Sequence, residues 1–106
     1  MTVTRVGFAS IPDATLQEQA IKIFNDSKNT RLKDGKPYII ESRATKCRSI
    51  RDTTGADNWN VIAWFTFASQ ADAEYYQYDD PVSKEMIRQG DSEGIGFIAV
   101  LAEFGN

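Results

Sequence analysis

Residues 59–67, which read Trp-Asn-Val-Ile-Ala-Trp-Phe-Thr-Phe, decide the fold of this chain. Their β-branched and aromatic side chains favour a strand, in which successive side chains point to opposite sides of the sheet. One face then carries Val61, Ala63, Phe65 and Phe67, and the other carries Ile62, Trp64, Thr66 and Ala68. Because both faces are largely apolar, this strand is predicted to be central in its sheet and to be covered from both sides.

The residues before this stretch predict two further strands with a helix between them. Hydrophobic spacing and turn residues mark the boundaries. In the first strand, Gly7 marks a bulge or a close approach of another group. In chain order the elements are a strand over Thr2 to Ile11, a helix from the capping box Thr15-Leu16-Gln17-Glu18 to about Asn29 or Leu32, a turn over Lys33 to Pro37 and a strand over Tyr38 to Arg51.

The residues after it predict two short helices and a last strand. Ser69 can cap the first helix, and Asp80-Pro81 interrupts the helical pattern, since aspartate is a good cap and proline suits the first helical position. Gly90 is predicted to stop the second helix. Ile95 to Phe104 then reads as a strand that is apolar on both faces.

The resulting order is β-α-β-β-α-β, which predicts an α+β, ferredoxin-like subunit with a four-stranded antiparallel sheet. Residues 1–106 are too few for a second domain. The helices can cover one sheet face only, yet the third and fourth strands are apolar on both faces. The simplest way to bury the second apolar sheet face is a second copy of the same chain. We therefore expect a homodimeric α/β barrel with an interface above about 2,000 Å² in total.

Composition narrows the functional classes. A formal charge of −3 argues against nucleic acid as the main partner. The chain has no histidine, so the commonest general base and metal ligand is missing, and we expect neither a metal nor a cofactor. The single cysteine, Cys47, rules out an internal disulfide. No membrane span or targeting signal is recognised, which favours the cytoplasm.

Three stretches in this order resemble a known family. They are Ile11-Pro12-Asp13-Ala14-Thr15, Lys33-Asp34-Gly35-Lys36-Pro37-Tyr38-Ile39, and Phe65-Thr66-Phe67-Ala68-Ser69 followed by Tyr75-Tyr76. The chain resembles the dimeric α/β-barrel superfamily and, within it, the stress-responsive A/B-barrel (Dabb) domain proteins, particularly their fungal members. The resemblance implies a homodimer and a pocket between each sheet and its helices. It leaves the function open, because the superfamily includes cofactor-free monooxygenases, polyketide cyclases, haem-degrading enzymes and decarboxylases.

The resemblance also suggests positions for a site. Similar cyclases use a tyrosine and a histidine on the second helical region, a histidine on strand one and an acid near the C-terminus. These fall on Tyr76, Ser83, Thr4 and Glu103 of this sequence. Both histidines are replaced, so a histidine-based cyclase mechanism does not transfer, and the same absence excludes histidine-ligated haem degradation.

The residues support two functional hypotheses. The first is a binding protein for a small, mainly apolar molecule. The second is a cofactor-independent cyclase, lyase or monooxygenase for an aromatic or polyketide-like substrate, with Tyr76 as acid and Glu103 or Asp79 as base. The ligand-binding candidates are Tyr75, Tyr78, Trp64, Phe8, Arg5 and Ser83.

Three of these assignments have alternatives. The pattern of the tyrosines at 75, 76 and 78 taken singly favours amphipathic wall positions with hydroxyls at the surface. Trp64 suits plain core or a dimer interface as well as a ligand site. Arg5 and Glu103 lie on strands expected to be central neighbours in the sheet, either as a charged pair in the pocket or as an ion pair at the dimer seam.

Overall fold

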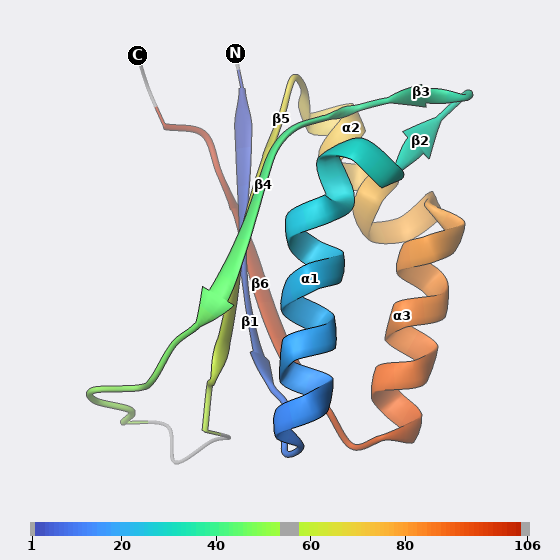
Figure 1. Ribbon diagram of the computed structural model, residues 1–106. Coiled ribbons are helices and arrows are strands. Elements are labelled where there is room, and N and C mark those ends of the chain that lie inside the picture. The colour runs from blue at the N-terminus through green and yellow to red at the C-terminus, as the bar shows by residue number, and fades with distance from the viewer. Residues whose placement is uncertain (1, 54–57, 105–106) are drawn as a thin grey trace.

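The computed structural model of the chain describes residues 2–53 and 58–104 and has the predicted ferredoxin-like arrangement (Figure 1). Both long helices lie on the same side of the sheet, and a small hairpin projects from one end. In chain order the elements are β1 (Val3–Ser10), α1 (Ala14–Thr30), β2 (Leu32–Lys33), β3 (Lys36–Pro37), β4 (Ile39–Lys46), β5 (Val61–Phe67), α2 (Gln70–Glu74), the π-helix η1 (Tyr75–Asp79), α3 (Pro81–Ser92) and β6 (Gly96–Ala102).

The main sheet has the strand order β4-β5-β1-β6, and each neighbouring pair is antiparallel. This confirms the predicted sheet and places β5 and β1 in its centre. The predicted neighbours β1 and β6 do pair, but β6 is an edge strand. Arg5 of β1 lies opposite Phe65 of β5 and Leu101 of β6, so the three side chains share one face.

The alternation predicted for the central strand is correct. Val61, Ala63, Phe65 and Phe67 are buried on the face that the helices cover. The ring of Phe24 on α1 lies edge-on to Phe65, with ring centroids 6.0 Å apart. This contact joins α1 to the middle of the sheet and forms the centre of the hydrophobic core.

Helix α1 begins slightly earlier than its predicted capping box. The cap is Asp13, whose backbone is extended and whose carboxylate accepts a hydrogen bond from the Leu16 amide. The side chain of Gln17 donates to the Ile11 carbonyl. The predicted capping box of Thr15 with Glu18 is therefore not the start of the helix. Pro12 directly precedes this cap, and the helix begins at Ala14.

The second helical region is broken at Asp80-Pro81, as predicted, and Asp80 caps α3 through the Val82 amide at 2.9 Å. The prediction that Gly90 stops this helix is wrong, because α3 continues to Ser92. Gly90 is buried where the ring of Phe97 packs, and a Cβ at position 90 would lie 2.6 Å from that ring. The glycine therefore lets β6 approach the end of α3.

The second long strand, β4, is shorter than the predicted Tyr38 to Arg51. The strand ends at Lys46. Beyond it, the Cys47 amide donates a hydrogen bond to the Asn60 carbonyl across the loop. The predicted turn at 33–37 closes a small hairpin, in which Asp34 and Gly35 both have positive φ. An Asp-Gly pair is typical of such a tight turn.

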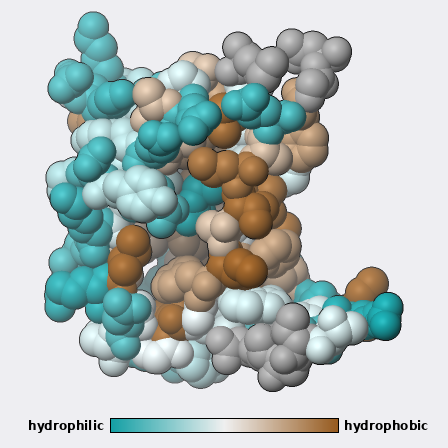
Figure 2. Space-filling view, turned by 180° about the vertical axis from the view of Figure 1, so that it is seen from behind, coloured by the Kyte–Doolittle hydropathy of each residue, from teal (hydrophilic) through white to brown (hydrophobic). Residues whose placement is uncertain are grey.

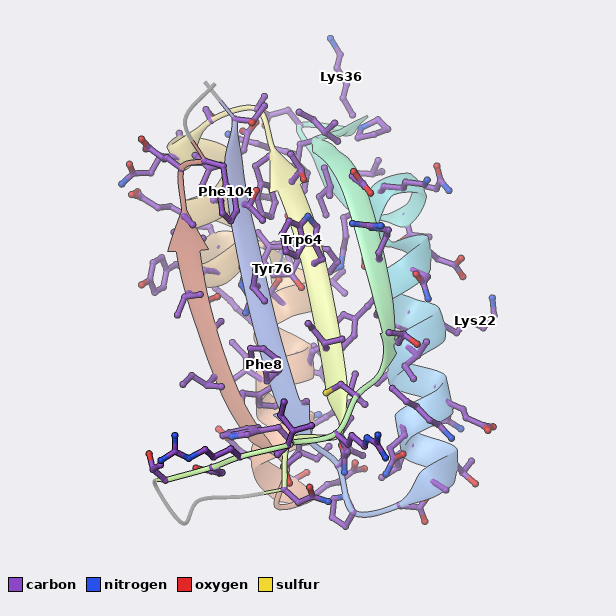
Figure 3. All side chains as sticks on the ribbon, turned by 90° about the vertical axis from the view of Figure 1, so that its left-hand side faces the viewer. Phe8, Lys22, Lys36, Trp64, Tyr76 and Phe104 are labelled. Atoms are coloured by element: carbon purple, nitrogen blue, oxygen red, sulfur yellow. The ribbon has the colours of Figure 1, made fainter. Side chains whose placement is uncertain are left out.

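The sheet face away from the helices carries two apolar rows. In one row Trp64, Val6 and Val100 lie opposite one another, and in the other Ile62, Phe8 and Ile98 do so. Together these six residues form what we call the open face, which faces the viewer in Figure 3. Figure 2 shows apolar side chains gathered in a band along one side of the molecule.

Val100 and Ile98 are about half exposed, at 55% and 49%, and the ring of Phe104 stacks on Trp64 with centroids 6.0 Å apart. A contiguous apolar surface of this kind is unusual on a monomer and marks an interaction site. In the part of the chain that the structure describes, no helix is both long and apolar enough to cross a membrane.

Candidate functional site

A cavity of about 630 Å³ lies between the sheet and the helices. Sites for small molecules typically have volumes of about 300 to 1,000 Å³ and a few polar groups on mainly apolar walls. The cavity fits that description, since its apolar lining includes Phe24, Met86, Ile95, Phe97, Ala99 and Leu101 and its buried or partly buried polar lining is Arg5, Arg31, Tyr76, Gln77 and Ser83.

The cavity exists because the helices do not close over the edge strand. Phe97 and Leu101 of β6 point toward the helical side, yet they remain 47% and 48% exposed. Helix α3 meets β6 mainly through Gly90, near the end of the helix. The remaining space between α3, β1 and β6 is the cavity.

Tyr76 is the most buried of the candidate catalytic residues, with 4% of its surface exposed. Its ring lies against Phe65 and Phe67, and the guanidinium carbons of Arg5 and Arg31 lie 5.0 and 4.9 Å from the ring centroid. Burial raises the pKa of the Tyr76 phenol, while the two positive charges act in the opposite direction. The phenol is therefore protonated at neutral pH and available as a donor.

The π-helix explains why Tyr76 is buried. Regular helical spacing would place Tyr75 and Tyr78 on one apolar stripe, but Tyr78 is 68% exposed. The wider π-helical turn over Tyr75–Asp79 changes the angle between successive side chains and turns Tyr76 inward. Such turns occur frequently at functional sites.

Arg31 and Asp80 form a buried ion pair behind Tyr76, and each side chain is 2% exposed. Nη1 of Arg31 lies 3.2 Å from Oδ2 of Asp80 and donates to Oγ of Ser83 at 2.7 Å. The same Asp80 oxygen accepts a hydrogen bond of 2.6 Å from the Tyr38 hydroxyl. The pair therefore ties the end of α1 to the start of α3 and fixes the wall on which Tyr76 lies.

Arg5 approaches Tyr76 from the sheet. Its Nε donates to Oε1 of Gln77 at 3.0 Å, and a Cβ at Gly7 would lie 2.9 Å from its Nη1. The predicted close approach at Gly7 is therefore the approach of Arg5. The resemblance placed Thr4 at the strand-one position of the site, but Thr4 lies on the opposite face of the sheet from Arg5 and does not line the cavity.

Four of the predicted site residues line the cavity with their side chains. They are Arg5, Tyr76, Ser83 and the exposed Tyr78. The hydroxyl of Ser83 is engaged by Arg31, as described above.

Five predicted site residues lie elsewhere. The side chain of Phe8 belongs to the open face, where it lies opposite Ile62 and Ile98. Side chains alternate between the two faces along a strand, and that of Trp64 lies on the open face, so it cannot reach the cavity. Tyr75 packs against Tyr38, with ring centroids 5.2 Å apart. Asp79 is exposed on the π-helix, and Glu103 follows the end of β6, where it lines a separate shallow depression. Neither carboxylate is therefore placed to act as a base for Tyr76, and Arg5 and Glu103 form no pair.

Sequence reasoning missed Arg31 and Gln77. Arg31 follows directly after α1, where the sequence shows only a helix end, and its partner Asp80 is far away along the chain. Gln77 lies within the π-helix, which has no recognisable sequence signal. Asp80 was recognised as a helix cap, but its ion pair with Arg31 is seen only in the three-dimensional structure.

The tyrosines in this wall predict that the fold weakens at high pH. Burial and the hydrogen bond to Asp80 raise the pKa of Tyr38 above its ordinary value of 10.0, and burial raises that of Tyr76. Above pH 10 the unfolded chain loses these phenol protons while the folded chain keeps them. The free energy of unfolding is therefore highest below pH 10 and falls as the pH rises further. Urea unfolding between pH 8 and 11 should show this fall, with a shallower slope in Tyr38→Phe. An unchanged slope in that variant would contradict it.

Among the described residues, no three Cys, Asp or Glu side chains gather closely enough to hold a metal ion.

Solved structures of the same fold match almost the whole chain. A dimeric ferredoxin-like protein of unknown function from Jannaschia sp. has a TM-score of 0.68 at 12% identity, with 98% of this chain and 100% of that chain covered. A Dabb family protein with a ferredoxin-like fold from Mesorhizobium loti has a TM-score of 0.62 at 14% identity, with 99% and 98% covered. SnoaB, a cofactor-independent oxygenase from Streptomyces nogalater, has a TM-score of 0.65 at 11% identity, with 99% and 94% covered.

No protein-family model and no curated protein matches the sequence. The chain is thus a ferredoxin-like α+β protein with a cavity between its sheet and its helices. Identities this low establish the fold alone, and activity has to be argued from the site.

Proposed function

We propose that this chain is the subunit of a homodimeric A/B-barrel protein, of the stress-responsive kind, that binds a small, mainly apolar molecule. The observation that carries the binding role is the 630 Å³ cavity with apolar walls and a polar end at Tyr76. The fungal subgroup suggested by the sequence and a cytoplasmic location stay predictions.

The open face supports the dimer. Its two apolar rows lie on the side of the sheet opposite α1 and α3, so a second sheet can pack on them without displacing a helix. A two-fold axis through this face would bury the same residues of both copies. Two of the similar structures are described as a dimeric protein and a Dabb family protein, which agrees with this arrangement.

The binding role is tested by titrating the ¹⁵N-labelled protein with 4-methylphenol, a neutral aromatic probe. We expect saturable shifts of backbone amides at the cavity, including Gly7, Gln77 and Ile95. Ala99→Trp should abolish them, because a large ring at this half-open wall position would fill the cavity. Saturable binding that survives Ala99→Trp, or shifts confined to the open face, would contradict the proposal.

A second function, cofactor-independent catalysis, is favoured by the surroundings of Tyr76. Its neutral phenol lies in a largely apolar cavity between two guanidinium groups, where a developing enolate would be stabilised. SnoaB, which shares the fold, is described as a cofactor-independent oxygenase. The sequence-based candidates for the base, Glu103 and Asp79, lie outside the cavity. A base would therefore have to come from Glu74 or Asp91, the exposed carboxylates that line the cavity, from the substrate or from solvent.

Tyr76→Phe distinguishes the two functions. If Tyr76 is a general acid, turnover of an aromatic or polyketide-like substrate should fall by about a hundredfold or more. If it only holds a ligand, affinity should change by one hydrogen bond, about 1 kcal/mol. The measurement is turnover and dissociation constant side by side, with circular dichroism to establish that the variant is folded. Unchanged turnover with weaker binding would reject the catalytic role.

A further inference from the structure

Arg5 carries a positive charge on the cavity wall without a carboxylate to balance it. Within residues 2–53 and 58–104, its side chain makes one hydrogen bond, from Nε to the neutral amide of Gln77, and no ion pair with Asp or Glu. An arginine side chain keeps its charge in a protein. Its guanidinium lies against the face of Tyr76, at 5.0 Å, which offsets part of the cost of burial.

The orientation of Arg5 leaves its two Nη groups available. Gln77 occupies Nε, and Gly7 provides the space beside Nη1 that any other residue would fill. Neither Nη group has an acceptor among the described residues. Every fully buried side-chain polar atom there has a hydrogen-bond partner, so the Nη groups are not fully buried. The Nη groups are therefore accessible from the cavity, which Arg5 lines.

At the buried end of the cavity, the side chains of Arg5, Arg31 and Asp80 together carry one net positive charge. Arg31 is neutralised by Asp80, so Arg5 is the unbalanced group. Two further carboxylates, Glu74 and Asp91, line the cavity rim, but both are exposed to solvent, where their charge is screened. The buried end of the cavity thus suits one negative charge.

We propose that the ligand of this cavity is an organic monoanion, with a carboxylate bound by the Nη groups of Arg5 and an apolar body along Phe97 and Leu101. The proposal rests on the binding function above and names the chemical class of the ligand. The fork of two N–H groups matches the two oxygens of a carboxylate. A phosphate dianion would leave its second charge unpaired among apolar walls, which is costly.

The test compares benzoate with benzamide, which has nearly the same shape and no charge, by calorimetric titration of the purified protein. We expect benzoate to bind at least about tenfold more tightly than benzamide, the effect of one charge-assisted hydrogen bond or more. In Arg5→Met this preference should disappear while benzamide binding remains. Arg88→Met is the matched control, because Arg88 is exposed on α3 and pairs with Glu85 there, and it should keep the preference.

The outcomes separate the two claims. Equal affinities for benzoate and benzamide in the native protein, or a preference that persists in Arg5→Met, would overturn the anion site and leave the cavity as a binding site. Absence of binding by both probes would reject the anion site and the binding function together. If Arg5→Met does not fold, Arg5→Gln, which is neutral and polar, is expected to lose the preference in the same way.

Discussion

Asp80→Asn is expected to lower the free energy of unfolding by about 3 kcal/mol or more, because it removes one member of a buried ion pair and leaves the other uncompensated. Arg31 would then be a 2% exposed guanidinium whose hydrogen bonds to Ser83 and Met86 cannot replace the lost negative charge. Asparagine is as good a helix cap as aspartate, so the cap on Val82 remains. The loss therefore measures the buried charge together with the Tyr38 hydrogen bond, because the asparagine NH2 group cannot accept from the Tyr38 hydroxyl. Urea denaturation followed by circular dichroism gives the value.

Asp79→Asn is the matched control. Asp79 precedes Asp80 directly but is exposed, so the same substitution there should change stability by no more than about 0.5 kcal/mol. Similar losses in the two variants would show that the Arg31–Asp80 pair does not stabilise the wall of the cavity.

Val100→Asp is expected to weaken self-association by about a thousandfold or more, because symmetry places two unpaired carboxylates in the apolar interface and each costs several kcal/mol when buried. Val100 lies at the edge-strand end of an open-face row and is 55% exposed in the single subunit. The subunit should therefore still fold. Sedimentation velocity over a range of concentrations measures the effect.

Val82→Asp tests whether position matters. Val82 is 47% exposed on α3, away from the open face, and an acidic residue suits the first turn of a helix. This variant should associate as the native protein does. Equal weakening by Val82→Asp and Val100→Asp would place the interface elsewhere.

The sheet and its two faces were predictable because they depend on local alternation. Val61, Phe65 and Phe67 follow a period of two and are buried together, while Ile62 and Trp64 lie on the open face. The break at Asp80-Pro81 was also predictable, since capping and proline geometry are local effects.

The candidate site was only partly predictable, because it depends on contacts between distant segments. Tyr76 was selected from the sequence, but its burial results from a π-helical turn that no residue type announces. The pairing of Arg31 with Asp80 joins the end of one helix to the start of another. Trp64 was wrongly assigned to the pocket because strand alternation identifies two faces and does not say which one the helices cover.

The most direct test of the central claim is the stoichiometry of the purified protein, measured by sedimentation equilibrium at micromolar concentration. The account predicts a dimer, because the apolar rows on β5, β1 and β6 need a second copy to cover them. Dissociation in Val100→Asp alone would then locate the interface. A monomer of the native chain at this concentration would contradict the account, because the open face would then be stable in water without a partner.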